Sequence, residues 1–536
     1  MPYHVLVTDG IDADGVALLS AEPALVVDEV PTLPVHELLE RIGRYDAIVG
    51  RSATRISEAL LQRAERLKVV GRAGVGVDNI ALDAATALGV AVINAPAGNT
   101  VAVAELVFGT LLALLRQIPQ ADRSMHEGRW DRSRLMGFEL KGRTIGIVGA
   151  GRIGGEVAAR AHAFGMTVVG YDPYVSEERF RTLRMRRVET LDDLLAEADV
   201  ITVHTPLTDE TRGMIGRREL GRLKPGAVIV NLARGGIVDE EALAAALGGD
   251  RLRGAVVDVF TSEPLPADHP LRGVPNLLLT PHMGASTFEA QRNVAVDVCA
   301  AVRDALLDGD LERSINVADM SSGGWRDLQP ALLVAQRAAA VARALLADQG
   351  ARAVQRITVR CGPEAMGGGG ALLAAAAVGA LEGVLGTDRL NLINARSLAE
   401  ARGIDLTVGE STHLGHPQAV EVSLGGGMQE IAVAGLAPQG SVPRLIRIGG
   451  FQVDVMLRQT LLVLTNRDVP GVIGRVGTLL GGAEVNIAEY HQSRLAQGGD
   501  ALAAISVDSP VGDEIRQQLL ELPDVRSATI VNFRAP

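Results

Sequence analysis

Over about the first hundred residues, apolar runs alternate with amphipathic helical stretches, a pattern typical of a parallel α/β domain. The predicted strands of this part are residues 4–8, 45–49, 67–70 and 90–94. A long apolar helix is expected at about residues 101–117, where it crosses to the next domain or packs on its neighbour. The chain therefore begins with a parallel sheet, and a second alternating region follows the long helix.

The second region opens with an apolar strand, residues 144–148, that runs into Gly149-Ala-Gly-Arg-Ile-Gly154 and then into a helical pattern. Glycines at this spacing allow a tight turn, a close backbone approach to a pyrophosphate, and close packing of helix on strand. The next strand, residues 167–172, ends in Asp172, which is placed to hold an adenosine ribose 2′-OH. The segment predicts a dinucleotide-binding turn, against the alternative of a glycine-rich turn without a ligand.

Four further strands end in polar residues. They lead to His204-Thr205-Pro206, to Asn231-Leu-Ala-Arg234, to Asp258, and to Pro281-His282. Ligands of open parallel sheets bind at the carboxyl ends of the strands, so these residues should converge on one crevice.

The residue types fit the oxidation of an alcohol. His282 can act as the base for the hydroxyl proton, and Glu263 can accept a hydrogen bond from the other imidazole nitrogen. Arg234 offers a planar fork for a substrate carboxylate or carbonyl. Taken singly, His282 is also compatible with a loop histidine whose hydrogen bonds are satisfied within the protein, and Glu263 and Arg234 are also compatible with surface charges. Their common position favours an active site.

Composition restricts the classes of function. The 536 residues predict three or four domains, and the net charge of −12 without clustered cations argues against binding nucleic acid. Two cysteines, Cys299 and Cys361, form no disulfide framework, so we expect a reducing cytoplasm. The apolar tract 370–385 is short and contains Glu382, so it predicts a buried helix and no membrane association.

The C-terminal third differs in composition, because residues 318–451 are rich in Ala, Gly and Val. The segment 366–370, Met-Gly-Gly-Gly-Gly, predicts a turn or flexible loop. Arg444 and Arg447 are a candidate anion site or hinge, and His413 with His416 lacks the companions of a metal site, so no metal is expected. The last eighty or so residues predict the βαββαβ order of a ferredoxin-like module, with elements at 460–465, 471–481, 487–494, 501–508, 512–522 and 527–533.

These motifs together resemble the D-isomer-specific 2-hydroxyacid dehydrogenase family, in its long form with a C-terminal ACT domain. The resemblance rests on the glycine turn, Tyr171-Asp-Pro173, His204-Thr-Pro-Leu207, Asn231-Leu-Ala-Arg-Gly-Gly236, Asp258-Val-Phe-Thr-Ser-Glu-Pro264 and Thr280-Pro-His282. It implies a Rossmann-type cofactor domain inserted in a flavodoxin-like substrate domain, then an α+β intervening domain of assembly or effector response, then the ferredoxin-like ACT domain. The implied boundaries are 1–98 and 283–317 for the substrate domain, 99–282 for the NAD domain, 318–453 for the intervening domain and 454–536 for the ACT domain.

The resemblance also assigns roles to residues. The implied catalytic set is Arg234, Glu263 and His282. The implied NAD contacts are Gly149, Gly151, Arg152, Ile153, Gly154, Asp172, His204, Thr205, Pro206, Ala233, Asp258, His282 and Gly284. The implied substrate contacts are Arg51, Val75, Gly76, Asn99, Arg132 and Arg234, with Arg134 as an alternative to Arg132. Asn466, Asp468 and Asn486 bring short polar side chains to one edge of the ACT domain, where an effector is expected.

The activity that the resemblance implies is NAD-dependent oxidation of D-3-phosphoglycerate to 3-phosphohydroxypyruvate, the first committed step of L-serine biosynthesis. L-serine is the expected effector, and a cytoplasmic homotetramer is the expected assembly. Two alternatives stay open at this point. A glyoxylate or hydroxypyruvate reductase shares the catalytic set without the long tail, and a non-catalytic NAD-sensing scaffold needs no turnover.

Overall fold

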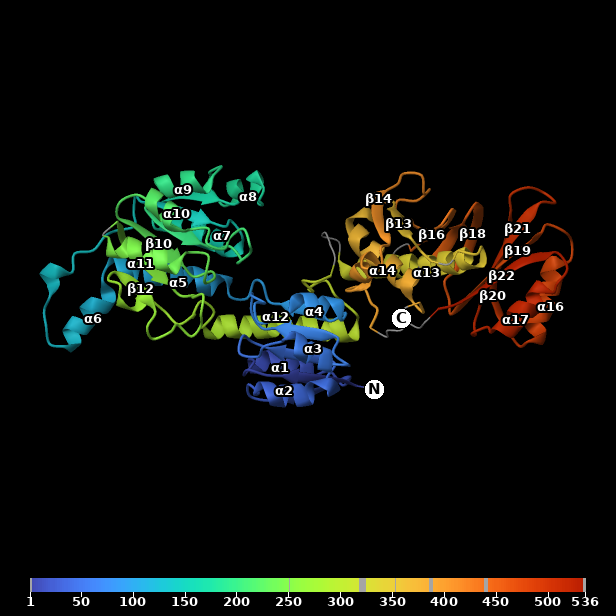
Figure 1. Cartoon of the computed structure of the whole chain (residues 1–536), viewed down its shortest axis with the longest axis horizontal. Coiled ribbons are helices and arrows are strands. Elements are labelled where there is room, and N and C mark those ends of the chain that lie inside the picture. Colours follow the sequence, from blue (N-terminus) through green and yellow to red (C-terminus); the bar gives the residue numbers. More distant parts are fainter. Residues whose placement is uncertain are drawn as a thin grey trace.

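The structure, a computed structural model, describes residues 2–249, 251–317, 324–351, 353–384, 389–437 and 442–533. Four sheets are strung along an elongated molecule (Figure 1). We number the domains from first to fourth by these sheets, in the order in which each sheet begins in the chain. The predicted boundary between residues 317 and 318 borders the segment 318–323, which lies outside the described residues.

The first domain has a five-stranded parallel sheet in the order β2-β1-β3-β4-β5, which confirms the flavodoxin-like expectation. Its edge strand β2 was not predicted; its apolar run, Leu25-Val-Val27, is short and is followed by Asp28 and Glu29. Its strands are β1 (Tyr3–Val7), β2 (Leu25–Glu29), β3 (Ala47–Gly50), β4 (Val69–Arg72) and β5 (Ala91–Asn94). Its helices are α1 (Ala13–Ser20), α2 (Val35–Arg41), α3 (Glu58–Arg63), α4 (Leu82–Ala87) and α12 (Phe288–Leu307).

The second domain has a seven-stranded parallel sheet in which β6 lies between β9 and β7, the Rossmann arrangement. The order is β12-β11-β10-β9-β6-β7-β8. The strands are β6 (Thr144–Val148), β7 (Thr167–Tyr171), β8 (Arg186–Arg187), β9 (Val200–Val203), β10 (Ala227–Asn231), β11 (Leu252–Val257) and β12 (Leu277–Leu279). The helices are α7 (Arg152–Ala163), α8 (Glu177–Thr182), α9 (Leu191–Glu197), α10 (Arg217–Arg222) and α11 (Glu240–Gly248).

Two helices connect the first and second domains. Helix α5 (Thr100–Leu115) leaves the end of β5 and packs on α7, and α12 returns the chain to the first domain, where it packs on α1. After α5 an arm with α6 (Ile118–His126) and the short helix η2 (Arg132–Arg134) runs away from the body of the molecule (Figure 1). The arm exposes Met125, Trp130 and Met136.

The third domain is α+β, as expected. Its sheet has the order β14-β13-β15-β16-β17-β18, in which β13 and β14 are parallel and the other pairs antiparallel. The strands are β13 (Arg356–Cys361), β14 (Asp405–Glu410), β15 (Val420–Gly426), β16 (Gln429–Leu436), β17 (Arg444–Ile448) and β18 (Phe451–Met456). Helices α13 (Trp325–Asp348), α14 (Gly369–Leu381) and α15 (Ala395–Glu400) complete the domain. Asn391 before α15 donates to the Gly89 carbonyl of the first domain at 2.7 Å.

The expectation of a loop at residues 366–370 is wrong. The short helix η4 (Met366–Gly368) leads directly into α14, and Gly368 and Gly369 are buried. A Cβ atom at Gly368 would lie 2.5 Å from the Leu328 side chain, and one at Gly369 would lie 3.0 Å from Val408. The glycines therefore serve close packing of the helix start, which composition alone does not reveal.

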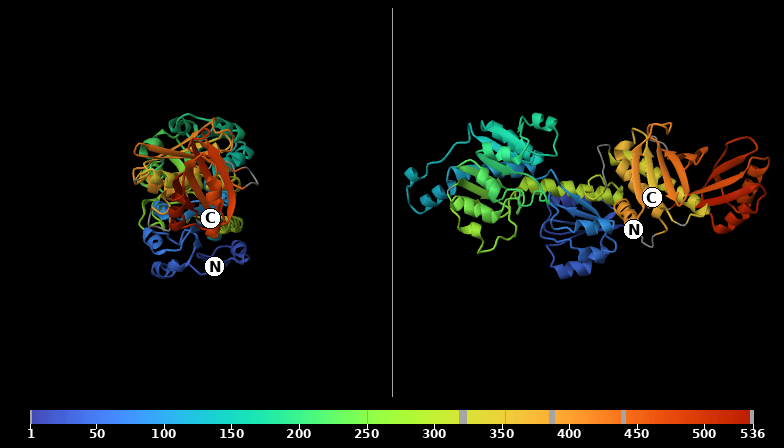
Figure 2. Two further views of the ribbon diagram at one scale, coloured as in Figure 1. Left: turned by 90° about the vertical axis from the view of Figure 1, so that its right-hand side faces the viewer. Right: turned by 45° about the horizontal axis from the view of Figure 1, so that its top comes forward.

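The fourth domain has the order β20-β21-β19-β22 with antiparallel pairing, which confirms the ferredoxin-like module. Its elements are β19 (Thr460–Arg467), α16 (Val472–Gly482), β20 (Ile487–Arg494), β21 (Asp500–Val507), α17 (Asp513–Leu520) and β22 (Val525–Asn532). One face of this sheet shares a hydrophobic core with the third domain, through Leu461, Val463 and Leu502. Figure 2 shows the two domains side by side at one end of the molecule.

Among the described residues, α13 is the helix with the length and apolarity of a membrane span, and the bent pair α5 and α6 passes the same test together. The tract 370–385 holds only the shorter apolar helix α14. Helix α13 packs on α14 and on strands β15 and β16, so its apolar residues belong to the core of the third domain. Helix α14, which covers residues 370–381 of the tract 370–385, is buried as expected, and residue 385 lies outside the described residues.

Candidate active site

The turn after β6 has the backbone that a dinucleotide requires. Gly149 has φ +99°, and a Cβ atom there would lie 2.6 Å from the His204 carbonyl oxygen. Gly154 packs directly on the Gly149 carbonyl. Gly151 is the N-cap of α7, and no atom lies within 4 Å of the Cβ position that it lacks. Helix α7 begins with Arg152 and Ile153, and the space in front of its N-terminus is open. A helix N-terminus is a common binding site for a phosphate group.

Asp172 lies at the end of β7, beside this turn. Its carboxylate accepts hydrogen bonds from the Ala150 N–H and the Tyr174 N–H, each at 3.0 Å. The Tyr174 hydroxyl donates to Glu210, which follows β9. Asp172 is thus fixed to the glycine turn in the position expected of a ribose-binding carboxylate.

The residues after β9 present unpaired polar atoms. The Nδ1 atom of His204 and the Oγ1 atom of Thr205 are buried without a hydrogen-bond partner among the described residues. The Nε2 atom of His204 lies 2.9 Å from the Thr202 hydroxyl, and burial lowers the pKa of His204 to about 3, so the ring is neutral at physiological pH. Pro206 follows and is exposed. Buried polar atoms without partners are costly, and a bound ligand is one way to satisfy them.

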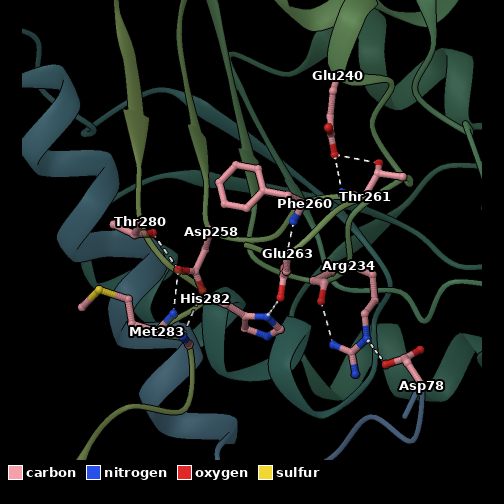
Figure 3. Close-up of polar contacts among 12 residues, drawn as sticks. Asp78, Arg234, Glu240, Asp258, Phe260, Thr261, Glu263, Thr280, His282 and Met283 are labelled. Carbon is pink, nitrogen blue, oxygen red and sulfur yellow. Dashed lines mark hydrogen bonds and ion pairs between the residues drawn. The ribbon is translucent and has the colours of Figure 1, made fainter. Parts of the chain in front are cut away.

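Asp258 organises the loop that carries His282. Its Oδ1 atom accepts from the Thr280 hydroxyl at 2.7 Å and from the Met283 N–H at 2.8 Å, and its Oδ2 atom accepts from the Gly284 N–H at 2.9 Å. Burial raises the pKa of Asp258, while these hydrogen bonds act in the opposite direction. Figure 3 shows the carboxylate on one side of His282 and Glu263 on the other.

His282 and Glu263 are in direct contact. The Nδ1 atom of His282 lies 2.7 Å from Glu263 Oε2, and Glu263 Oε1 accepts from the Phe260 N–H at 3.0 Å. His282 has φ +53°, an uncommon conformation for a residue with a side chain. Its backbone N–H donates to the Asp258 carbonyl at 2.9 Å. The loop therefore holds the imidazole with Nε2 as the ring nitrogen that Glu263 leaves free.

Arg234 spans the two domains (Figure 3). Its Nε atom lies 3.0 Å from Asp78 of the first domain, and its Nη1 atom donates to the carbonyl of Ala233 at 2.7 Å. A Cβ atom on Gly76 would collide with the guanidinium, so this glycine lets the arginine approach. The carboxyl ends of both sheets therefore face one cleft.

Three more predicted substrate residues lie in the first domain or at its exit. Arg51 follows β3, and none of the carboxylates described forms an ion pair with its guanidinium. The Val75 carbonyl accepts from the Asn94 amide at 2.6 Å, which shapes the loop after β4. The Oδ1 atom of Asn99, just before α5, is buried without a partner in the described part of the chain.

Arg72 is a site residue that the sequence analysis missed. It ends β4, its Nε atom is buried without a described partner, and its Nη1 atom donates to the Ala73 carbonyl at 3.2 Å. Burial, and to a lesser extent the positive charges of Arg234 and Arg51, lowers the pKa of Arg72 to about 10. The signal was present, because Arg72 is a polar residue at the end of a strand, like the residues that were singled out.

Arg132 and Arg134 are not brought to this site within one chain. Both lie in η2 on the exposed arm, and neither contacts another of the predicted site residues. The sequence shows the two charges but neither the short helix nor the direction of the arm.

The expectation that Asn466, Asp468 and Asn486 share one edge is wrong for a single chain. Asn466 lies opposite Ala501 at the start of β21, whereas Asn486 donates to Asp508 beyond the end of β21. Strands β19 and β20 are therefore parallel, and the two asparagines sit at opposite ends of the sheet. Asp468 already accepts hydrogen bonds from Arg494 and the Gly498 N–H, at 2.9 and 3.1 Å, and these lower its pKa.

Arg444 and Arg447 do not form an open anion site. Arg444 pairs with Asp454 and with Glu489, and Arg447 pairs with the buried Glu421. Arg444 thereby joins β17 and β18 to β20 of the fourth domain, which favours a rigid junction over a hinge. Among the described residues there is no cluster of three metal-ligating side chains.

Comparisons with known proteins place the site in context. Residues 108–284 match the model of the D-isomer specific 2-hydroxyacid dehydrogenase NAD binding domain. The chain is 35% identical to D-3-phosphoglycerate dehydrogenase of Methanocaldococcus jannaschii over 529 residues, 99% of each chain. It is 38% identical to D-3-phosphoglycerate dehydrogenase of Synechocystis over 531 residues, 99% of this chain and 94% of that one. The structure of a glyoxylate reductase from Paecilomyes thermophila is similar with a TM-score of 0.54 and 31% identity, and covers 59% of this chain and 99% of that one.

Proposed function

The chain belongs to the D-isomer-specific 2-hydroxyacid dehydrogenase family, and we propose that it oxidises D-3-phosphoglycerate to 3-phosphohydroxypyruvate with NAD. This reaction is the first committed step of L-serine biosynthesis. The observation that carries the proposal is the grouping of three arginines. Arg51 and Arg72 line one small cavity, and the guanidinium of Arg234 approaches Gly76 in the loop that follows Arg72. The charges of Arg51 and Arg234 act on Arg72 in the direction that lowers its pKa. Three cations with one ion pair, to Asp78, suit a substrate that has both a phosphate and a carboxylate.

The second domain has the features that NAD requires. Gly151 leaves space at the N-terminus of α7, Asp172 offers a carboxylate to a ribose, and His204 and Thr205 have buried polar atoms without partners. NAD, when bound, accepts a hydride from the carbon that carries the substrate hydroxyl.

His282 is the proposed base. Glu263 is bonded to Nδ1, which leaves Nε2 to take the proton of the substrate hydroxyl. The negative charge of Glu263 favours the imidazolium that forms, in the manner of the carboxylate of a catalytic triad. Asp258 positions His282 through the backbone of residues 282–284.

Arg234 is the proposed ligand of the substrate carboxylate, because its guanidinium enters the cleft from the second domain and bridges to the first. Arg51 and Arg72 are the proposed ligands of the phosphate, with Gly76 and Val75 lining the approach. Asn99 offers a buried amide oxygen at the start of α5. Arg132 or Arg134 of a second copy is the proposed further cation.

Two alternative functions need fewer of the features described above. A glyoxylate or hydroxypyruvate reductase needs no phosphate ligands, and the glyoxylate reductase structure matches 59% of this chain, whereas the phosphoglycerate dehydrogenase relatives match 99%. A non-catalytic NAD-sensing scaffold would need neither the contact of His282 with Glu263 nor an arginine, Arg234, that bridges the two domains. Both are less well supported.

Regulation and assembly are part of the proposal. L-serine would bind between two fourth domains, with Asn466 and Asp468 of one chain and Asn486 of a second, since one chain keeps them at opposite ends of its sheet. The exposed apolar residues of the arm support association of chains, and we propose a homotetramer. Free buried thiols at Cys299 and Cys361 support a cytoplasmic location.

The test of the proposal is a comparison of substrates. We expect kcat/KM for D-3-phosphoglycerate to exceed that for unphosphorylated D-glycerate by at least about a hundredfold, because D-glycerate lacks a charge-assisted contact to two arginines. Arg51→Ala should remove most of this preference while leaving D-glycerate oxidation unchanged. Equal kcat/KM values for both substrates in the parent protein would restore the reductase alternative.

A further inference from the structure

Asp9 has a backbone that needs an explanation. It follows β1 with φ +66°, and Gly10 after it has φ +62°. Two successive residues in the left-handed region turn the chain sharply, and for a residue with a side chain this conformation is uncommon, although Asp tolerates it better than most. Strained residues of this kind persist where the surroundings hold them, often next to a functional site.

The turn places the Asp9 carboxylate against residues 51–54, the segment that carries Arg51. Oδ2 accepts hydrogen bonds from the Arg51 N–H at 2.8 Å and from the Thr54 N–H at 3.0 Å. Oδ1 accepts from the Thr54 hydroxyl at 2.7 Å and from the Thr32 hydroxyl at 2.8 Å. One carboxylate therefore has four donors, three of them from the ends of this short segment.

Asn79 holds the same segment by its carbonyl groups. Its amide Nδ2 donates to the Arg51 carbonyl at 3.0 Å and to the Thr54 carbonyl at 2.7 Å. Asn79 is itself fixed, because its own carbonyl accepts from the Ile56 N–H at 2.9 Å. The N–H and carbonyl groups of Arg51 and Thr54 are thus all bonded to two side chains, one from each neighbouring loop.

The segment has no other regular support. Residues 51–54 are neither helix nor strand, so their backbone groups depend on side chains or water. Without Asp9 and Asn79, the segment would have to be ordered when substrate binds, and that loss of conformational freedom would weaken binding.

Charge gives Asp9 a second effect. Its carboxylate acts on Arg72 in the sense that raises the pKa of that guanidinium, against the effect of Arg51 and Arg234. None of the ion pairs described joins Asp9 to an arginine side chain. Asp9 therefore offsets the repulsion among the arginines while leaving the guanidinium of Arg51 available.

We infer that Asp9 and Asn79 are positioning residues that pre-order residues 51–54 and so aim Arg51 at the phosphate of the substrate. The inference rests on the proposed function, because it takes Arg51 to be a phosphate ligand. Neither residue touches the substrate; both act through the backbone of Arg51 and Thr54.

The test uses the full-length protein with NAD and the variant Asp9→Asn. An asparagine keeps the size of the side chain but removes its charge. Its amide NH2 can face the two hydroxyls, which accept as well as donate, so the change weakens the bonds to the Arg51 and Thr54 N–H groups from charge-assisted to neutral ones. We expect KM for D-3-phosphoglycerate to rise about tenfold, while kcat, the KM for D-glycerate and the Kd for NAD stay within about twofold. Asp12→Asn, the same charge change at the N-cap of α1, is the matched control and should leave all four constants unchanged.

A double variant decides whether Asp9 acts through Arg51. Asp9→Asn combined with Arg51→Ala should have the same KM for D-3-phosphoglycerate as Arg51→Ala alone, because the positioned side chain is gone. Multiplicative effects of the two changes, or an equal rise of KM for D-glycerate, would overturn the inference. If Asp9→Asn does not fold, as judged by circular dichroism, Asn79→Ala replaces it with the same expected selectivity and the same contradicting result.

The two levels of the account fail differently. If Arg51→Ala leaves the preference for the phosphorylated substrate intact, the proposed function loses its phosphate site. If Arg51→Ala removes the preference but Asp9→Asn and Asn79→Ala do not reduce it, only the positioning role is wrong.

Discussion

The Nε atom of Arg234, in the second domain, lies 3.0 Å from the carboxylate of Asp78, in the first. The side chain of Asp78 is 67% exposed, so this ion pair is a surface contact across the cleft. In the proposed mechanism a substrate carboxylate takes the place of Asp78 on the guanidinium. Asp78 therefore competes with the substrate carboxylate for the guanidinium of Arg234.

Asp78→Asn tests this competition. Exposed ion pairs are worth up to about 1 kcal/mol, so removing the competitor should lower KM for D-3-phosphoglycerate by up to about fivefold with little change in kcat. The exposed Asp83 of α4 provides the control variant Asp83→Asn, which should have no effect. A rise in KM on Asp78→Asn would show that Asp78 helps to assemble the site instead.

The choice between NAD and NADP depends on Asp172. Its carboxylate, held by the N–H groups of Ala150 and Tyr174, suits a ribose hydroxyl and repels a 2′-phosphate. We expect a strong preference for NAD in the parent protein and a much smaller one in Asp172→Ala, measured as the ratio of kcat/KM for the two cofactors. Equal use of both cofactors by the parent protein would refute this role.

Arg72 should lower the stability of the ligand-free protein and strengthen the binding of substrate. Its pKa is lowered to about 10 in the fold, below the ordinary value of an arginine, so the charged form is disfavoured by folding, and the penalty is present at all pH values below about 10. Arg72→Met removes the charge, and we expect the Tm of the ligand-free protein at pH 7 to rise by roughly 2–4 °C.

The same variant should raise KM for D-3-phosphoglycerate and lose the stabilisation that inorganic phosphate gives to the parent. Differential scanning calorimetry with and without phosphate measures both effects on Tm. Arg63→Met, at an exposed arginine of α3, is the control. A fall in Tm for Arg72→Met in the absence of phosphate would contradict the account of a repulsive arginine cluster.

Features that depend on residues close together in the sequence were predicted better than features that depend on how distant elements pack. The glycine turn, the strand ends at His204, Asp258 and His282, and the ferredoxin-like order are all local signals, because each depends on residues close together in the sequence. The contact of Glu263 with His282 was also expected, since both residues follow neighbouring strands of one sheet.

The failures have a common physical cause. The glycines at 366–370 predict a loop by composition, but they are needed for close packing against Leu328 and Val408, which belong to other elements. The direction of the arm with Arg132, and the separation of Asn466 from Asn486, depend on how whole elements pack. Arg72 also ends a strand, but its burial and its place near Arg51 and Arg234 depend on the packing of the two domains.

Serine regulation calls for intact chains, because the third and fourth domains share one hydrophobic core and a truncation between them would expose it. Calorimetry should detect binding of L-serine to the full-length protein, and Asn486→Ala should weaken that binding about tenfold or more without changing KM for D-3-phosphoglycerate. D-serine serves as the control ligand and should not bind. No detectable binding of L-serine would leave the fourth domain as an assembly contact.

The most direct measurement is the initial rate of NADH formation at 340 nm from D-3-phosphoglycerate and NAD, for the parent protein and for His282→Ala. The account predicts turnover by the parent and a loss of about a hundredfold or more in His282→Ala, with the Kd for NAD nearly unchanged, because a general base has been removed. Absence of NADH formation by the folded parent protein, or full activity of His282→Ala, would contradict it.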